Sequence, residues 1–399
     1  MPTLNWIGKE AVVKHHKEVP YRLLEADPAL SCGDADSGNL IVQGDNLHAL
    51  KALLPRYAGQ VKCIYIDPPY NTGNEGWVYN DNVNSPEIRR WLGEVVGKEG
   101  ETLDRHDRWL CMMYPRLVLL RQFLREDGVI FVSIDDYEIA RLRLLMDEVF
   151  GTRNFVHEIV WKNKYGPGAM TKGFGNIHEY ILCYSKNPLS SIEAHLSSEE
   201  AARYKNKDDK FKVRGGYVTQ PLMTKSKDPR PNLVYPVYYN GHEIWPDKQW
   251  IWEKNRLQEA IKNDEVVFRK NKGKWSVRFK QYLKDSAGNI RKAKPISILT
   301  GPFNQEGTWE IEDIFGNRNI FSNPKPSSLI AYLISMIING DEDKNCIVMD
   351  SFAGSGTTAH AVLKQNAEDG GNRRFILVEM DENIAANVTA ERVRRVIEG

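Results

Sequence analysis

Short, continuous apolar runs alternate with amphipathic segments of helical length in two stretches of this chain. The runs are NLIVQ (39–43), VKCIYI (61–66), GVIFVSI (128–134) and YILCY (180–184) in the first stretch, and CIVMD (346–350) and RFILVEMD (374–381) in the second. Strands that are apolar throughout are typical of a parallel sheet covered by helices on both faces. We therefore expect one α/β domain with a Rossmann-like sheet, completed by both stretches and ending in a single helix (382–398).

The segment between the two stretches differs from them in charge. Residues 201–300 hold 23 Lys and Arg against 10 Asp and Glu, whereas the rest of the chain holds 31 against 43. The net charge of the whole chain is only +1, so this asymmetry indicates an acidic body joined to a basic module that binds a polyanion. We expect an N-terminal extension (1–38), two halves of the α/β domain (39–189 and 311–399), and an inserted basic α+β domain (190–310).

The composition argues against several classes of protein. Five cysteines are spread along the chain without a CxxC pair, so neither a disulfide framework nor a zinc or iron–sulfur site is expected. The opening residues MPTLNWIGKEAVVKHH are too polar for a secretory signal, and no apolar run of about 18 residues is present to span a bilayer. We expect a soluble, cytoplasmic protein that needs no metal ion and no membrane.

A glycine-rich turn, DSFAGSGTT (350–358), follows the apolar run CIVM and opens a segment of helical length. Gly354 and Gly356 let the backbone approach a ligand closely, and the start of the helix offers free N–H groups. The phosphate-binding loop of ATPases needs Lys after its second glycine, but Thr357 stands there. The turn is therefore predicted to hold a cofactor. Glu379, at the tip of the next strand, is placed to accept hydrogen bonds from ribose hydroxyls, although an acid near a helix N-terminus is the simpler reading of an isolated Glu.

A second group of residues, Asp67, Pro68, Pro69 and Tyr70, follows the run VKCIYI, at the sheet edge where ligands of open α/β sheets bind. The exocyclic amine of an aromatic base is a weak nucleophile because its lone pair is conjugated with the ring. Hydrogen bonds from that amine to the carboxylate of Asp67 and the carbonyl of Pro68 favour a pyramidal nitrogen that can attack. The prolines stiffen the loop, and Tyr70 offers a face on which an extruded base can stack.

Together these motifs, in this order and with a basic insert between them, resemble the amino-methyltransferases of DNA of the beta class. The segments NLIVQGDNLHALKALL, IDPPYNTGN, DGVIFVSIDD, FGNIHEYILCYSK and SNPKPSSLI are similar to the modification subunits of type III restriction–modification systems. The resemblance implies a bacterial or phage-encoded, site-specific methyltransferase that uses S-adenosylmethionine to methylate the N6 amine of a flipped adenine in duplex DNA. Such subunits are commonly longer than this chain. A homodimer and a restriction subunit are expected as partners on the resemblance alone.

The resemblance also gives roles to particular residues. Asp67, Pro68, Pro69 and Tyr70 would form the catalytic loop. The residues implied to bind the cofactor are Asp45, Lys325, Asp350, Phe352, Gly354, Gly356, Thr357 and Glu379. Asp45 would lie near the adenine ring of the cofactor, and a helix N-cap is a second reading of it; for Lys325 the second reading is a Pro-rich helix start. His178 and Glu179 match a segment near the flipped base.

The inserted domain is expected to recognise the target, mainly through phosphate contacts that position the protein on duplex DNA. The candidate residues are Lys205, Lys207, Arg214, Lys225, Lys227, Arg230, Arg269, Lys270, Lys272 and Lys274. Three tryptophans of the insert, Trp245, Trp250 and Trp252, are expected to form its core rather than to stack on bases.

Other functions stay open on the sequence alone. Methylation of cytosine N4 follows the same chemistry but often uses Ser in place of Asp67, so adenine is favoured. A cytosine carbon-5 enzyme needs a nucleophilic Cys, usually after Pro, and no Pro–Cys pair occurs. RNA or protein substrates, and a non-catalytic DNA-binding protein on a decayed scaffold, are further alternatives; the complete motifs argue against decay. No Walker motif or obvious nuclease cluster is present, so we expect no DNA cleavage by this chain.

Overall fold

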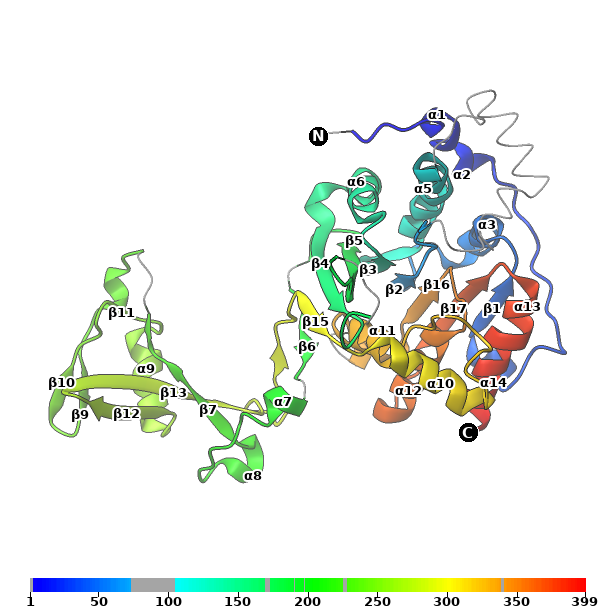
Figure 1. The fold of residues 1–399 in the computed structure, drawn as a ribbon. Coiled ribbons are helices and arrows are strands. Elements are labelled where there is room, and N and C mark those ends of the chain that lie inside the picture. The colour runs from blue at the N-terminus through cyan, green and yellow to red at the C-terminus, as the bar shows by residue number, and fades with distance from the viewer. Residues whose placement is uncertain are drawn as a thin grey trace. The chain divides into compact units, whose positions relative to one another are not determined.

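The computed structural model describes residues 3–72, 105–168, 173–189, 191–196, 198–224, 228–338 and 341–399. The chain forms two compact units (Figure 1). The larger unit comprises Met1–Ala194 and Lys294–Gly399, and the smaller unit comprises His195–Ala293. The inserted domain expected at 190–310 is longer than the smaller unit, because residues 294–310 supply an edge strand and the first part of a helix to the larger unit.

The larger unit is built on an eight-stranded sheet (Figure 1). The strand order is β1 (Leu40–Gln43), β17 (Arg374–Glu379), β16 (Ile347–Asp350), β2 (Val61–Ile66), β3 (Leu124–Ile134), β5 (His178–Ser185), β4 (Phe155–Lys162) and β15 (Ile298–Thr300). The five strands from β1 to β3 in this order are parallel to their neighbours. Since β16 and β17 lie between β1 and β2, the two stretches that flank the insert complete one Rossmann-like sheet, as expected.

The sheet is mixed, so the expectation of a wholly parallel sheet is wrong at one edge. β5 runs antiparallel to both β3 and β4, whereas β15 is parallel to β4. Parallel neighbours need a crossover of a dozen or more residues, usually a helix, whereas antiparallel neighbours accept a short connection. β4 and β5 follow each other directly, and the described part of their connection contains no helix.

Helices cover both faces of the sheet (Figure 1). One face packs against α3 (Asn46–Tyr57), α5 (Arg105–Phe123) and α6 (Ile139–Phe150), and the other against α11 (Ser327–Ser335), α12 (Thr357–Asp369) and α14 (Glu391–Glu398). Side chains alternate between the two faces along each strand. In β2, Ile64 and Ile66 belong to the first core, and Cys63 and Tyr65 to the second. No helix in the described ranges is long and apolar enough to cross a membrane.

The C-terminal segment departs from the single regular helix expected over 382–398. It consists of α13 (Glu382–Ile384), a π-helical turn (Ala385–Ala390) and α14. Thr389 in the π turn donates a hydrogen bond from Oγ1 to the carbonyl of Gly354 at 2.6 Å. Single π turns within helices are rare and occur frequently at functional sites. Here the turn brings a side chain of the last helical segment onto the glycine-rich turn.

Within the described residues, the remaining helices of the larger unit are short, apart from α10. They are α1 (Lys9–Val12), α2 (His15–Glu18), α10 (Asn304–Phe315) and the 3₁₀ turns Ala35–Ser37, Thr152–Asn154 and Asp341–Asn345. α1 and α2 lie in the N-terminal extension, and both pack against α5. α10 packs against α14.

The smaller unit is an α+β unit with its own core. Its main sheet is antiparallel, in the order β12 (Val266–Asn271), β13 (Lys274–Tyr282) and β7 (Tyr217–Pro221). Its other elements are α7 (Ser198–Ala201), α8 (Phe211–Arg214), β8 (Met223–Thr224), a 3₁₀ turn (Pro231–Leu233), β9 (Val237–Tyr239), β10 (His242–Ile244), β11 (Gln249–Trp250) and α9 (Lys254–Lys262), while β6 (Ala194–His195) and β14 (Lys292–Ala293) stand at its ends. Trp250 is fully buried in the core and Trp252 packs against it. Trp245 is 53% exposed, so the prediction that all three tryptophans are core residues is wrong for Trp245.

Candidate active site

The loop Asp67–Tyr70 leaves the sheet at the carboxyl end of β2, next to the glycine-rich turn. β2 pairs in parallel with β16, which ends at Asp350, so the two motifs follow neighbouring strands at the same edge. Trp109 on α5 is fully buried and donates a hydrogen bond from Nε1 to the carbonyl of Pro69 at 2.7 Å. Together with the two prolines, this bond restricts the loop on the side covered by α5.

Both carboxylate oxygens of Asp67 are contacted by polar side chains. The hydroxyl of Tyr70 lies 2.8 Å from Oδ1, and the ammonium of Lys325 donates to Oδ2 at 2.7 Å. Lys325 also donates to the hydroxyl of Tyr70 at 2.9 Å. The sequence assigned Lys325 to the cofactor and Asp67 to the base, but the structure brings the two side chains together.

Glu179 on β5 completes this cluster. Its Oε2 lies 3.0 Å from the hydroxyl of Tyr70 and 3.5 Å from the ammonium of Lys325. Its Oε1 accepts a hydrogen bond of 2.6 Å from the amide of Asn163. His178, the other residue of this segment, contacts the hydroxyl of Tyr180 instead, at 3.0 Å. Of the pair that the sequence placed near the flipped base, Glu179 is thus the one in contact with Lys325 and Tyr70.

The charges of the cluster are set by burial and by its two carboxylates. Burial lowers the pKa of Lys325, but the charges of Asp67 and Glu179 outweigh it, so the pKa lies above the usual value for lysine. The pKa of Tyr70 is raised well above its usual value, first by burial and then by the same two carboxylates. At neutral pH the cluster therefore holds an ammonium ion and a neutral phenol. The single proton of the phenol serves only one of the two carboxylates at a time.

The glycine-rich turn is held from inside by Asp350. This residue is buried; its Oδ1 accepts from the backbone N–H of Phe352 at 3.0 Å and its Oδ2 accepts from the hydroxyl of Thr358 at 2.6 Å. Burial raises the pKa of Asp350 to about 7, although both hydrogen bonds favour the charged form. Phe352 is 4% exposed and belongs to the core under α3 and α5. Asp350 and Phe352 therefore shape the turn rather than project from it.

Gly354 and Gly356 adopt backbone conformations that other residues rarely take. Their φ angles are +49° and +76°. A Cβ atom on Gly354 would lie 3.0 Å from Cζ of Phe321, and one on Gly356 would lie 3.3 Å from Thr389. At position 354, only glycine can adopt this φ angle and fit beside Phe321 without displacing neighbouring atoms.

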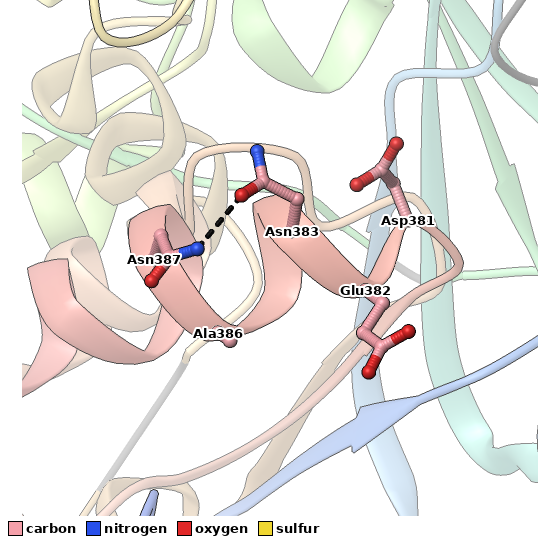
Figure 2. A pocket seen from close by; sticks show the side chains of 5 residues that line it. All are labelled: Asp381, Glu382, Asn383, Ala386 and Asn387. Carbon is pink, nitrogen blue, oxygen red and sulfur yellow. Dashed lines mark hydrogen bonds between the residues drawn. The ribbon is translucent and has the colours of Figure 1, made fainter.

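Glu379 ends β17 and faces the glycine-rich turn. Its Oε2 accepts from the backbone N–H of Gly354 at 2.7 Å, and its Oε1 accepts from those of Met380 and Asp381 at 2.8 and 3.0 Å. Burial raises its pKa, and the backbone hydrogen bonds oppose that shift. A pocket opens directly beyond it, lined by Asp381, Glu382, Asn383, Ala386 and Asn387 (Figure 2). The sequence did not single out these residues, although their place directly after the acid was the available signal.

Asp45 caps a helix beside the same strand end. Its Oδ1 accepts from the backbone N–H groups of Leu47 and His48 at 3.0 and 3.1 Å, and its Oδ2 lies 3.3 Å from Arg116. The preceding residue, Gly44, donates a backbone hydrogen bond of 2.9 Å to the carbonyl of Glu379. Asp45 is thus an N-cap residue that also stands next to Glu379, and both readings of it from the sequence are compatible.

A buried carboxylate that the sequence did not reveal anchors the end of the Asp67–Tyr70 loop. Glu138, which follows β3, is fully buried, and its Oε1 accepts from the amide of Asn71 at 2.5 Å and contacts Nδ1 of His106. Asn71 comes directly after Tyr70 and has a left-handed φ of +63°. A carboxylate at the carboxyl end of a parallel strand was the signal that could have revealed this role.

The chain that carries this site matches a known protein family. The sequence model of the family described as DNA methylase matches residues 61–391. The chain is a member of the DNA methylase family. The matched region contains the Asp67–Tyr70 loop, the glycine-rich turn and Glu379, together with the whole smaller unit.

Curated relatives of this DNA methylase align with most of its length. It is 34% identical, over 98% of its length, to the type III restriction–modification enzyme StyLTI Mod subunit of Salmonella typhimurium, of which it covers 60%. It is 34% identical, over 96% of its length, to the EcoPI Mod subunit of Escherichia phage P1, of which it covers 64%. It is 30% identical, over 89% of its length, to the type II methyltransferase M.KpnI of Klebsiella pneumoniae, of which it covers 83%. The chain thus spans less than two thirds of the two Mod subunits and most of M.KpnI.

The basic residues that were predicted to contact DNA lie in the smaller unit of this DNA methylase. Lys225 and Lys227 fall outside the described residues. Those with exposed side chains are Lys205, Lys207, Arg230, Arg269, Lys270, Lys272 and Lys274. The last four belong to the hairpin formed by β12 and β13. Arg214 differs from them because its guanidinium donates to Glu265 at 2.8 Å and lies over the ring of Tyr282.

Proposed function

We propose that this DNA methylase transfers the methyl group of S-adenosylmethionine to the N6 amine of an adenine flipped out of duplex DNA. The observation that carries the proposal is the place of Asp67, at the end of β2 and beside the glycine-rich turn at the end of β16. With these two loops adjacent, one can hold the amine while the other holds the methyl donor. Holding both reactants in line supplies much of the acceleration in such a transfer.

Asp67 and Pro68 act on the amine through hydrogen bonds. By accepting the two N–H groups, the carboxylate and the carbonyl favour a pyramidal nitrogen with a free lone pair. As the new N–C bond forms, positive charge develops on the nitrogen, and the carboxylate of Asp67 stabilises it and is placed to take up the proton that the amine releases. The ring of Tyr70 supports the extruded base by stacking, which offsets part of the cost of unstacking it.

The residues at the ends of β16 and β17 fit S-adenosylmethionine. The positive φ angles of Gly354 and Gly356 give a turn without side chains, against which a ligand can lie closely. Oε2 of Glu379 accepts one backbone hydrogen bond and has a second acceptor site for a ribose hydroxyl, whereas both sites of Oε1 accept backbone N–H groups. The pocket beyond Asp381 offers room for the adenine ring of the cofactor. When bound, the cofactor supplies an electrophilic methyl group on a positively charged sulfur.

The names of the relatives support a place in restriction–modification. Two are Mod subunits of type III enzymes and one is a type II methyltransferase. We therefore propose that the chain acts on duplex DNA in the cytoplasm of a bacterium, as a modification subunit that forms a homodimer and assembles with a restriction subunit. In this scheme residues 39–189 and 311–399 supply catalysis and cofactor binding, and the smaller unit, within 190–310, recognises the target.

Expression of the chain in a methylation-free bacterial host, followed by sequencing that detects modified bases directly, tests the proposal. N6-methyladenine at one short sequence is expected, and it should vanish with Asp67→Ala, which removes the acceptor of the amine. N4-methylcytosine would overturn the choice of base. A genome without either base, obtained with folded protein that binds S-adenosylmethionine, would contradict the activity of the chain on its own.

A further inference from the structure

The ammonium of Lys325 donates to the carboxylate that the proposed function assigns to the target amine. A base amine must donate its N–H groups to the carboxylate of Asp67, but Nζ of Lys325 already lies 2.7 Å from Oδ2. An ammonium and an exocyclic amine are both N–H donors with nitrogen-to-oxygen distances near 2.7–3.0 Å, so they compete for the same acceptor. Lys325 takes one of the two acceptor sites of Oδ2, so the amine has to compete with the ammonium for this oxygen.

We propose that Lys325 stands in for the target amine while the base pocket is empty, and that it moves to Glu179 when the base enters. The proposal rests on the proposed function and adds a positioning role for Glu179. Oε2 of Glu179 is already 3.5 Å from Nζ of Lys325, so a shift of about 1 Å converts this contact into a direct hydrogen bond. The shift frees Oδ2 of Asp67 for the amine.

Charge explains why Glu179 is needed for this exchange. The side chain of Lys325 is only 10% exposed, and an ammonium in such a place is costly unless a carboxylate stays paired with it. If Lys325 left Asp67 without a second carboxylate in reach, it would become an unpaired buried charge. With Glu179 as the receiving group, Lys325 stays neutralised, and Asp67 keeps its own negative charge for the nitrogen that becomes positive during transfer.

The surroundings of the two residues restrict the movement to the side chain of Lys325. The carbonyl of Lys325 accepts a hydrogen bond of 3.1 Å from the hydroxyl of Thr357, which fixes its backbone. Glu179 is held in place by the hydrogen bond of 2.6 Å between its Oε1 and Asn163. Since both anchors are independent of Asp67, rotation about the side-chain bonds of Lys325 suffices for the exchange.

The test measures entry of the base rather than methylation, with the full chain and a duplex that carries its recognition sequence. 2-Aminopurine next to the target adenine reports unstacking by its fluorescence, while the target keeps its amine. Glu179→Gln, which removes the receiving charge, is expected to weaken base entry about tenfold, a typical coupling between residues in contact. Lys325→Met removes the competing ammonium and is expected to leave base entry unchanged or stronger. In the double variant, base entry should return to the level of Lys325→Met.

Two further variants test whether the effect is specific to the ammonium of Lys325. Lys9→Met removes a lysine that pairs with Glu148 at the same distance of 2.7 Å, outside the site, and it should leave the fluorescence response unchanged. Lys325→Arg keeps a cation that binds carboxylates in two-pronged fashion and should weaken base entry because it releases Asp67 less readily. If Lys325→Met unfolds, as seen in its thermal transition, Lys325→Arg and Glu179→Gln still decide.

The proposal would be overturned if base entry in the double variant stayed as weak as in Glu179→Gln. It would also be overturned if Glu179→Gln itself left base entry unchanged. A target purine that lacks the amine adds a second criterion, because it does not compete for Asp67: the difference between wild type and Glu179→Gln should then disappear. The proposed function fails separately, through absence of methylated bases in the genome of the host that expresses wild-type protein.

Discussion

Arg392 on α14 and Glu310 on α10 form a buried ion pair, with 2.9 Å between Nη2 and Oε2. The side chain of Arg392 is fully buried, and its Nη1 donates to the hydroxyls of Ser355 and Thr357 at 3.0 and 2.9 Å. Glu310 also accepts from the backbone N–H and the hydroxyl of Ser327 at the start of α11. One ion pair thus joins the glycine-rich turn to the segment that carries Lys325, the lysine that contacts Asp67.

Arg392→Met should destabilise the larger unit, because Glu310 loses its ion pair and two buried hydroxyls lose a hydrogen-bond donor. Removing one partner of a buried pair costs about 3–5 kcal/mol, and the partial exposure of Glu310 lowers the expected loss to about 2–3 kcal/mol. Chemical denaturation followed by circular dichroism measures it. Arg395→Met removes a pair on the same helix that is 45% exposed at the arginine and should cost no more than about 1 kcal/mol. Equal losses in the two variants would contradict the role given to Arg392.

Gly354→Ala should weaken binding of the cofactor. The φ angle of +49° strains any other residue by about 1–2 kcal/mol, and the new methyl group would press on Phe321 and on the surface where the ligand is expected. Titration calorimetry with S-adenosylhomocysteine, the demethylated product, is expected to show a loss of at least about tenfold in affinity. Gly370→Ala is the matched control, because Gly370 ends α12 with a φ of +67° and has no atom near the position of a new Cβ. It should lower stability and leave the affinity unchanged; an unaltered affinity in Gly354→Ala would place the cofactor elsewhere.

Asp350 should make the stability of the larger unit fall as the pH rises. Burial raises its pKa from 3.8 to about 7, so the folded state binds a proton that the unfolded state has lost. The stability linked to this proton is complete below pH 4 and is lost as the pH rises through 7. Asp350→Asn, which cannot titrate, should therefore show a smaller decrease in the free energy of unfolding between pH 5 and pH 8 than the wild type.

Urea unfolding at a series of pH values measures this difference. Asp127→Asn is the control, since Arg125 and Lys62 hold the pKa of Asp127 below its usual range. A carboxylate of that kind is charged in both states above pH 5 and contributes no slope there. Parallel curves for wild type and Asp350→Asn would show that Asp350 carries no excess proton near neutral pH.

The elements that the sequence predicted best are those whose burial is complete. The run at 61–66 is the strand β2 with the same ends, and every residue of it is buried. A strand apolar on both faces leaves a continuous signal in the sequence. The sequence did not predict β4, because its eight residues are mostly half-buried and their polarity follows no simple alternation. Half-buried strands of this kind depend on the strands beside them, here β5 and β15, which local sequence does not encode.

In the candidate site too, some features were predicted from the sequence and others were not. The loop at Asp67 and the turn at Gly354 were predicted because both are local motifs at strand ends. The contact between Lys325 and Asp67 joins residues 258 positions apart, and it depends on the order of strands in the sheet, which no single segment specifies. The same holds for Glu179, which reaches the cluster only because β5 lies beside β3 as an antiparallel strand.

The hairpin of β12 and β13 should carry much of the affinity for DNA. Arg269, Lys270, Lys272 and Lys274 are exposed there within six residues, and none of the described ion pairs neutralises them. Each phosphate contact releases counterions, so the logarithm of the binding constant falls with that of the salt concentration, with a slope near −0.9 per contact. Lys270→Gln with Lys274→Gln should reduce that slope by about 1–2 and weaken binding to all sequences alike. Arg214→Gln should leave the slope unchanged, because Glu265 already neutralises this arginine, and a slope unaffected by the hairpin variant would exclude the hairpin from the contact with DNA.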